Sequence, residues 1–492
     1  MGSLNTLTVR QAVDHLEQGA CSSEELVRDL LSARTALDGT IQGYLQMDGE
    51  RALAEARHAD ADRKKGRRGR LLGVPLAVKD ILNVTGQACR CGSRILDGYT
   101  APYDATAIAR LRAEGAIFVG RTNMDEFGMG SSTENSAFGP TRNPWNSACV
   151  PGGSSGGSAA VVAADMALAA LGSDTGGSVR QPAAFCGCTG LKPSYGRVSR
   201  YGLVAYASSL DQIGPLTKDV DDAALLLGVM AGPDPRDSSS VEALVEDYAA
   251  ACGSDLKGMK LGLPRDYFVK GLEPAVEAAI RAAIERCREL GAEVVEVSLP
   301  HTSVAIPTYY IVATAEASAN LARFDGVRYG FRAEGAEDVL EVYAKTRAQG
   351  FGPEVKRRII LGTYVLSGGY HDAYYVRAQK VRTLIRRDFE DAFKTCDAIL
   401  APVAPTAAYR LGEKMADPLQ MYLGDIFTVP ASLAGICGLS VPCGFTPAGL
   451  PVGLQVLGPA FGESRVLRVG SAYQKSTDWH RRRPALAAEG GR

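Results

Sequence analysis

The segment Val150-Pro-Gly-Gly-Ser-Ser-Gly-Gly-Ser-Ala-Ala160 decides how the rest of this 492-residue chain is interpreted. A flexible Gly/Ser spacer should join two independent units, but an alanine- and valine-rich run follows this segment at once. A second cluster, Gly172-Ser-Asp-Thr-Gly-Gly-Ser-Val-Arg180, comes soon after that run. The segment is therefore interpreted as part of a folded body and not as a linker.

Two known kinds of loop share this glycine spacing. A phosphate-binding loop, G-x-x-x-x-G-K-[ST], fits Gly152 and Gly157, but Ser158 stands where the lysine is required. A G-x-S-x-G nucleophile elbow fits the segment with Ser155 as the nucleophile, and such an elbow needs a downstream histidine. The three candidate histidines lie in segments typical of ordinary surface or helix: His301, His371 and His480. Serine chemistry without histidine remains as the other alternative.

Lys79 is the candidate base for such chemistry. A serine hydroxyl is a weak nucleophile that needs a base. A lysine serves only when it is neutral, and burial must then lower its pKa from about 10.4. Lys79 ends the apolar run Gly73-Val-Pro-Leu-Ala-Val78, which is typical of a buried strand. A solvated charge at this position is the alternative interpretation.

Helix-then-strand units recur along the chain. Thr106–Gly115 is helical and stops at glycine before the strand 116–119, and residues 276–290 stop at Gly291 before the strand 294–297. Such alternation predicts a layered α/β architecture. Residues 7–60 are expected to be helical, beginning one helix at a capping box of Ser22 and Glu25.

The expected organisation is one large α/β body with a helical lead-in. We expect the lead-in over 1–70, the body over 71–485 with a helical layer at about 338–395, and a tail over 486–492. The basic run Arg63–Arg70 is interpreted as a solvated linker, with a contact to a partner or to RNA as the alternative.

Composition excludes several classes of protein as defaults. The net charge of -1 argues against a surface that itself holds a nucleic-acid backbone. The longest apolar run, 159–171, is shorter than the ~20 residues that span a bilayer. No basic stretch followed by an apolar stretch is visible at the start, and eleven cysteines suit reduced thiols better than a disulfide framework. A cytoplasmic protein without membrane contact or metal site is expected.

Three motifs together resemble the amidase signature family: Gly73–Asp80, Pro151–Ser158 and Gly172–Ala183. The resemblance implies an α/β fold with a large mixed central β-sheet covered by helices on both faces. It also implies a serine–serine–lysine triad. Ser178 would be the nucleophile, Ser154 a relay whose preceding peptide bond is cis, and Lys79 the base.

The same resemblance implies an oxyanion hole in the second cluster. The main-chain N–H groups of Thr175, Gly176, Gly177 and Ser178 would donate to the oxygen that becomes negative as Ser178 attacks an amide. Losing one such donor typically costs about 2.7–4 kcal/mol of transition-state stabilisation.

Four further segments resemble one branch of the family, the A subunits of glutamyl-tRNA(Gln)/aspartyl-tRNA(Asn) amidotransferases: 130–145, 190–203, 354–359 and 422–430. In that branch glutamine is hydrolysed and its ammonia passes to a B subunit. The B subunit uses ATP and Mg²⁺ to amidate the aminoacyl-tRNA and makes most of the tRNA contacts, while a small C subunit wraps around both. No cofactor is implied for this chain.

The branch resemblance also implies a glutamine pocket. Arg358 would pair with the α-carboxylate, Asp425 would accept from the α-ammonium group, and Tyr309 would offer a hydroxyl and a wall. Ser131 is a further pocket candidate, while a like-for-like change at Tyr206 is expected to leave the chemistry untouched. A stand-alone amidase for small amides and a non-catalytic scaffold subunit are the alternative functions.

Overall fold

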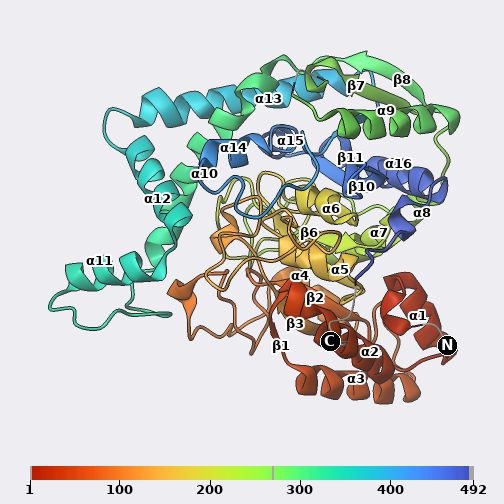
Figure 1. Ribbon diagram of the computed structural model, residues 1–492, viewed down its shortest axis with the longest axis horizontal. Helices are drawn as coiled ribbons and strands as arrows, with labels where there is room; N and C mark the ends of the chain where they lie inside the picture. Colours follow the sequence, from red (N-terminus) through yellow and green to blue (C-terminus); the bar gives the residue numbers. More distant parts are fainter. Residues whose placement is uncertain (1–2, 269–270, 487–492) are drawn as a thin grey trace.

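The computed structural model describes residues 3–268 and 271–486 and is built on one mixed β-sheet (Figure 1). Within these residues the sheet has eleven strands. Strands β3, β2 and β4 are parallel to one another, as are β9, β7 and β8, whereas the strands between these two groups and the edge strand β1 pair in antiparallel fashion. The strands, in order across the sheet, are β1 (Tyr44–Met47), β3 (Ile117–Thr122), β2 (Pro75–Lys79), β4 (Ala169–Asp174), β6 (Gln212–Thr217), β5 (Thr189–Lys192), β10 (Cys437–Phe445), β11 (Pro451–Gly458), β9 (Ala398–Pro402), β7 (Lys260–Pro264) and β8 (Glu293–Val297).

Helices surround this sheet. They are α1 (Val9–Gln18), α2 (Ser23–Ile41), α3 (Gly49–Lys64), α4 (Thr106–Ala113), α5 (Gly156–Ala163), α6 (Arg180–Cys186), α7 (Val220–Met230), α8 (Tyr248–Ala251), α9 (Pro274–Glu289), α10 (Ala305–Asn320), α11 (Val339–Gly350), α12 (Pro353–Leu366), α13 (Arg377–Ala392), α14 (Pro418–Leu423), α15 (Val429–Ala434) and α16 (Glu463–Lys475). A π-helical turn, Asp372–Val376, leads into α13.

Strand β10 shows that helices cover both faces of the sheet. The α-carbon of Gly438 faces Arg180 of α6, whereas Leu439 packs against Gly470 of α16. Because successive strand residues point to opposite faces, α6 and α16 lie on opposite sides. The predicted α/β fold with a large mixed sheet covered on both faces is confirmed.

The predicted helix-then-strand units are also confirmed. Helix α4 leads through Gly115 into β3, and α9 leads through Gly291 into β8. Both glycines have φ near +95°, the left-handed conformation that ends helices and favours glycine (+93° and +95°). The expected helical layer at 338–395 consists of α11, α12 and α13.

The N-terminal region is less purely helical than expected. Ser22 and Glu25 do form the capping box of α2. The prediction of helix throughout 7–60 is wrong, however, because Tyr44–Met47 forms strand β1 at the edge of the sheet, antiparallel to β3. The Asp38 carboxylate accepts from the N–H groups of Gly43 and Tyr44, and so fixes the turn from helix to strand.

Ion pairs attach the basic run to the fold. Arg67 pairs with Asp62 and Arg70 with Glu114, while Arg63 donates to the carbonyl of Leu72. Six of the residues in the run are exposed: Lys64, Lys65, Gly66, Arg67, Arg68 and Arg70. Residues 63–70 are therefore solvated as expected, although surface ion pairs hold them against the fold. Most of the expected tail, residues 487–492, lies outside the described residues.

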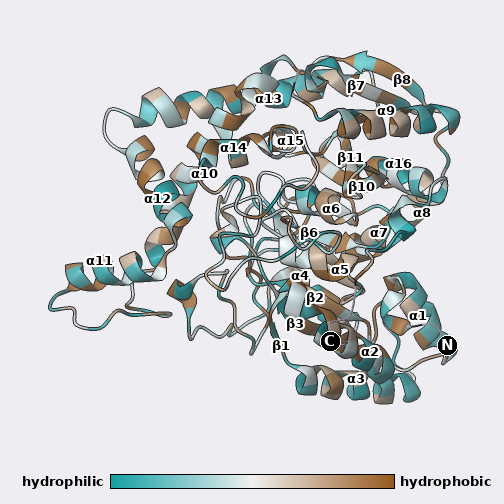
Figure 2. Cartoon of the chain, viewed as in Figure 1, coloured by the Kyte–Doolittle hydropathy of each residue, from teal (hydrophilic) through white to brown (hydrophobic). Residues whose placement is uncertain are grey.

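The most hydrophobic helix lies next to the glycine–serine segment. Every residue of α5, which begins directly after Ser155, is buried and the helix is mainly hydrophobic, whereas α13 is mainly hydrophilic (Figure 2). Packing of α5 against β4 places Gly156 and its neighbours deep in the molecule. The segment that resembled a spacer is therefore part of the core.

Candidate active site

Lys79, the last residue of β2, projects its amine into a cluster of serine hydroxyls. Its Nζ lies 2.7 Å from Ser154 Oγ, 2.8 Å from Ser155 Oγ and 2.9 Å from Ser173 Oγ. The side chain is fully buried, and burial lowers its pKa to about 7, although nearby carboxylates, first Asp125, act in the opposite direction. A substantial fraction of this amine is therefore neutral near pH 7.

Ser155 has its hydroxyl proton committed elsewhere. The hydroxyl donates to the main-chain carbonyl of Ser173, at 3.1 Å, so its oxygen accepts from Lys79. No histidine hydrogen bonds to Ser155 in the part of the chain that the structure describes. This arrangement differs from that of a nucleophile elbow, in which a histidine takes the serine proton.

Ser154 connects the two glycine–serine clusters. The peptide bond between Gly153 and Ser154 is cis, as the resemblance implies. The next residue, Ser155, donates its main-chain N–H to the carbonyl of Ser178 at 3.1 Å. Asp125 lies on the other side and donates its own N–H to the carbonyl of Ser154 at 3.3 Å. The backbone of the proposed nucleophile is thus bonded to the residue that follows the proposed relay.

A buried ion pair anchors the loop that carries Ser178. This loop leaves β4 at Asp174 and enters α6 at Arg180, and the two side chains form two hydrogen bonds of 3.0 Å. Arg180 also donates to Ser432 and Gln455, two residues from distant parts of the chain. On the other side of the loop, the Thr175 hydroxyl donates to Asp211 at 2.7 Å.

The same loop presents main-chain donors without acceptors. Within residues 3–268 and 271–486, the N–H groups of Thr175, Gly176, Gly177 and Ser178 donate to no protein group, and the Ser178 hydroxyl makes no hydrogen bond. Buried N–H groups nearly always have a partner. Four free donors beside a free serine hydroxyl can receive the oxygen of a bound carbonyl group.

Two of the three residues expected to bind glutamine, Tyr309 and Asp425, lie close to this loop. Tyr309, on α10, packs so closely on Gly176 that a Cβ at the glycine would lie 2.9 Å from the tyrosine oxygen. Gly177 packs in the same way on Thr428, which donates to the carbonyl of Asp425 at 3.2 Å. The side chain of Asp425 accepts a hydrogen bond from Ser131. Burial raises the pKa of Asp425 to about 7, while that hydrogen bond and Arg358 oppose the rise.

Arg358, on α12, is buried among aromatic rings. Its Nε donates to Glu354 at 2.8 Å and its Nη1 donates to the Tyr206 hydroxyl at 2.7 Å. Its guanidinium carbon lies 5.1 Å from the centre of the Tyr310 ring and 5.2 Å from that of Tyr422. Tyr206, where a like-for-like change is expected to leave the chemistry untouched, thus contacts a predicted binding residue through its hydroxyl.

Sequence reasoning missed three of these contacts. Ser173 contacts Lys79, Glu354 contacts Arg358, and Asp211 holds the nucleophile loop. Glu354 stands at the start of a segment that carried the branch resemblance, so its position was a signal. Ser173 lies within the motif Gly172–Ala183, so its position was a signal too. Nothing in the sequence distinguishes Asp211 from other residues near a strand end.

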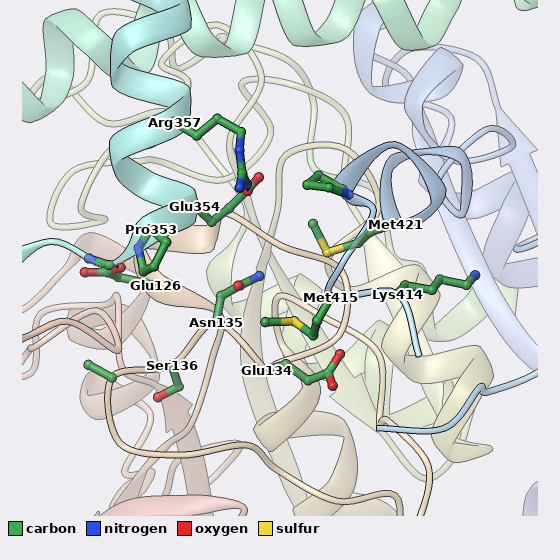
Figure 3. Close-up of a pocket in the computed structure, with 13 residues that line it drawn as sticks. Glu126, Glu134, Asn135, Ser136, Pro353, Glu354, Arg357, Lys414, Met415 and Met421 are labelled. Atoms are coloured by element: carbon green, nitrogen blue, oxygen red, sulfur yellow. Dashed lines mark hydrogen bonds and ion pairs between the residues drawn. The ribbon is translucent and has the colours of Figure 1, made fainter. Parts of the chain in front are cut away.

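A cavity of about 240 Å³ opens on the Arg358 side of the site (Figure 3). Glu354 and Arg357 of α12 project into it from one side, and Met415 and Met421 lie on the other. It is lined by Glu354 but by none of Lys79, Ser154 and Ser178. Tyr309, Arg358 and Asp425 do not line it either, so the cavity meets the site only through Glu354, the partner of Arg358.

The described residues include no group of three or more side chains suited to hold a metal ion. None of the helices in residues 3–268 and 271–486 has the length and apolar character needed to cross a membrane.

This fold and this serine–lysine cluster define a class of protein. The profile of the Amidase family matches residues 25–467, and the chain belongs to that family. It is similar, at 58% identity, to the A subunit of glutamyl-tRNA(Gln) amidotransferase from Roseiflexus castenholzii, with full coverage of both chains. The A subunit of the same enzyme from Geobacter sp. strain M21 is 56% identical, over 98% of this chain and 99% of that protein.

Solved structures agree with these relatives. The crystal structure of the A subunit of glutamyl-tRNA(Gln) amidotransferase from Thermotoga maritima is 41% identical and has a TM-score of 0.81, with 97% of this chain and 96% of that chain covered. A bacterial aryl acylamidase of the amidase signature family has a TM-score of 0.85 at 26% identity, over 96% and 97% of the two chains. The fold is therefore shared by an amidotransferase subunit and an aryl acylamidase.

Proposed function

We propose that this chain is the glutamine-hydrolysing A subunit of a tRNA-dependent amidotransferase. Full-length similarity of 58% to an A subunit of glutamyl-tRNA(Gln) amidotransferase carries the proposal. Arg358 and Asp425, both buried, offer the opposite charges that a zwitterionic amino acid requires. Glutamine is an amino acid with a side-chain amide, and so fits both the charges and the chemistry.

The hydrogen bonds around Lys79 support a lone pair that points at Ser154. A neutral amine has two N–H groups and one lone pair. Ser155 accepts one N–H because its own proton goes to Ser173, and Ser173 Oγ accepts the other at 2.9 Å. The lone pair then faces Ser154, which is 2.7 Å away. Lys79 therefore acts as the base toward Ser154.

Proton transfer through Ser154 activates Ser178. Lys79 takes the Ser154 proton while Ser154 takes that of Ser178, whose oxygen attacks the side-chain amide carbon of glutamine. The N–H groups of residues 175–178 stabilise the oxyanion. The C–N bond then breaks, the relay returns a proton to the leaving nitrogen, and ammonia departs. Water hydrolyses the acyl-serine to glutamate and free enzyme.

The ammonia is used by partner subunits. We infer that a B subunit receives it and, with ATP and Mg²⁺, converts Glu-tRNA(Gln), Asp-tRNA(Asn) or both to the amidated forms, while a C subunit joins the two. The B subunit makes most of the tRNA contacts, in keeping with the net charge of -1 on this chain. The chain itself uses no cofactor.

Substrate preference tests the proposal. The chain is purified together with its co-expressed partners, and ammonia release from glutamine is compared with release from acetamide and benzamide. We expect glutamine to be strongly preferred. Preference for a simple amide would support a stand-alone amidase instead, which the similarity to an aryl acylamidase makes the second candidate. Release from none of the amides would favour a scaffold.

A further inference from the structure

The guanidinium group of Arg358 is fixed from several sides before any ligand binds. Its Nε donates to Glu354 Oε1 and its Nη1 donates to Tyr206 Oη, while the rings of Tyr310 and Tyr422 flank it. The side chain is only 2% exposed. Since a free arginine side chain has many rotamers, these contacts select one of them.

Glu354 is itself held in place as an anion. The Tyr422 hydroxyl donates to the same Oε1 at 2.6 Å, and Arg357 donates to the other carboxylate oxygen. Burial favours a higher pKa for Glu354, but the charge of Arg358 and these hydrogen bonds outweigh it and leave the pKa below its usual value. Glu354 is therefore a fixed negative partner for Arg358.

One nitrogen of Arg358 stays uncommitted. In the described residues, Nη2 donates to no protein acceptor. An arginine can pair with a carboxylate side-on through Nε and Nη2 or end-on through Nη1 and Nη2. Glu354 occupies Nε and so blocks the side-on mode. A ligand carboxylate must therefore approach the Nη2 end. Of the two bidentate geometries, only the end-on one remains for the pairing expected from the sequence.

Tyr206 links this arrangement to the loop of the nucleophile. Its main-chain N–H donates to Asp211 at 2.9 Å, and Asp211 accepts from the hydroxyl of Thr175 at 2.7 Å. The hydroxyl that holds Nη1 and the loop that carries Ser178 are therefore positioned by one carboxylate. A shift of Arg358 relative to Ser178 would require breaking these hydrogen bonds.

We propose that Glu354 and Tyr206 are positioning residues that set the specificity for an α-carboxylate, by aiming the Nη2 end of Arg358 at the substrate. The inference rests on the proposed function, because it assumes that an amino acid is the substrate. Neither residue touches the reacting atoms, and each acts through Arg358. A substrate without the carboxylate gains nothing from this arrangement.

The test compares glutamine with its α-methyl ester, which keeps the side-chain amide but lacks the carboxylate. Ammonia release from each is measured for Glu354→Gln, Tyr206→Phe and the unaltered chain, all in complex with the partner subunits. We expect kcat/KM for glutamine to fall about 10- to 100-fold, mainly through KM, while that for the ester changes less than about threefold. Glu341→Gln is the matched control, because Glu341 forms an exposed i,i+4 pair with Lys345 on α11.

Two results would overturn the inference. An equal loss on both substrates would assign the two residues a purely structural role, and a stronger preference for glutamine would mean that Glu354 competes with the ligand. Transamidation with free ammonia reports whether each complex is folded, and Tyr206→Phe decides the matter if Glu354→Gln does not assemble. Failure of the unaltered complex to use glutamine would instead contradict the proposed function.

Discussion

The amine of Lys79 lies 2.7 Å from the hydroxyl of Ser154, although the two residues are 75 positions apart in the sequence. The parallel pairing of β2 with β4 brings about this contact, because the glycine–serine segment runs past the ends of both strands. Ser155 and Ser173 occupy the other hydrogen-bonding positions around the amine. This arrangement leads to separate predictions for each part of the site.

Replacement of serines distinguishes the nucleophile from its neighbour. We expect Ser178→Ala to lower glutamine-dependent transamidation at least about 1,000-fold, because the attacking oxygen is lost. Ser155→Ala should lower it only about 10- to 100-fold, because one hydrogen bond that orients Lys79 is lost. Transamidation with free ammonia serves as the control and should persist in both variants. The reverse order of severity would restore the nucleophile-elbow interpretation.

The pH dependence reports the protonation state of Lys79. Below its pKa of about 7 the amine is charged and cannot accept a proton, so kcat should rise with pH through about 7 and then level off. Asp425, whose pKa is also raised to about 7, must be ionised to bind the α-ammonium group. Its ionisation therefore makes kcat/KM rise with pH over the same range. The dependence of kcat on pH, measured on the complex saturated with glutamine, separates the effect of Lys79 from that of Asp425. A kcat that falls between pH 6 and 8 would contradict the role of Lys79.

The charge of Asp125 offers a second check on the same base. Among the carboxylates that act on Lys79, Asp125 is the strongest in raising its pKa. Asp125→Asn removes this charge, so the rise in kcat should move to lower pH. The measurement is again kcat against pH at saturating glutamine. Asp62→Asn, which removes a partner of Arg67 on the surface, should leave the profile where it is.

Gly177 tests the tight packing of the oxyanion loop. A Cβ there would lie 2.3 Å from Thr428 Oγ1, and φ is +152°, so Gly177→Ala must displace the loop or Thr428. We expect kcat/KM for glutamine to fall at least about 100-fold, as when an oxyanion donor is lost. Gly449→Ala is the matched control, since φ is +77° but nothing lies within 4 Å. Equal effects of the two changes would attribute the loss to backbone strain alone.

The ion pair at the base of the loop contributes to stability. Arg180→Met leaves Asp174 buried without its partner, so the free energy of unfolding should fall by about 3–5 kcal/mol in a denaturant titration. Arg281→Met removes an exposed pair with Glu277 and should cost less than about 1 kcal/mol. Similar losses of unfolding free energy in the two variants would show that the buried ion pair stabilises the fold no more than the exposed one.

Local signals in the sequence predicted two helix ends and one buried strand. Gly115 and Gly291 end helices through a left-handed backbone, and the apolar run before Lys79 forms a buried strand. Strand β1 was not predicted, because four residues between two long helices carry too little periodicity. Its conformation depends on pairing with β3.

The motif residues of the site were predictable, whereas their supporting contacts were not. Ser154 and Ser178 lie in recognisable clusters. Tyr206 meets Arg358 across 152 residues, and Asp211 reaches Thr175 only because both lie at the ends of paired strands, β6 and β4. Such contacts follow from the folded sheet, and no spacing in the sequence indicates them.

The bonds of Arg180 to Ser432 and Gln455 have a consequence for synthesis on the ribosome. Lys79, Ser154 and Ser178 have all been translated before half of the chain has emerged. Two of the side chains that hold the loop of Ser178 in place, Ser432 and Gln455, follow only near the C-terminus. A nascent chain thus carries every reactive group of the site before it has all of the side chains that align them.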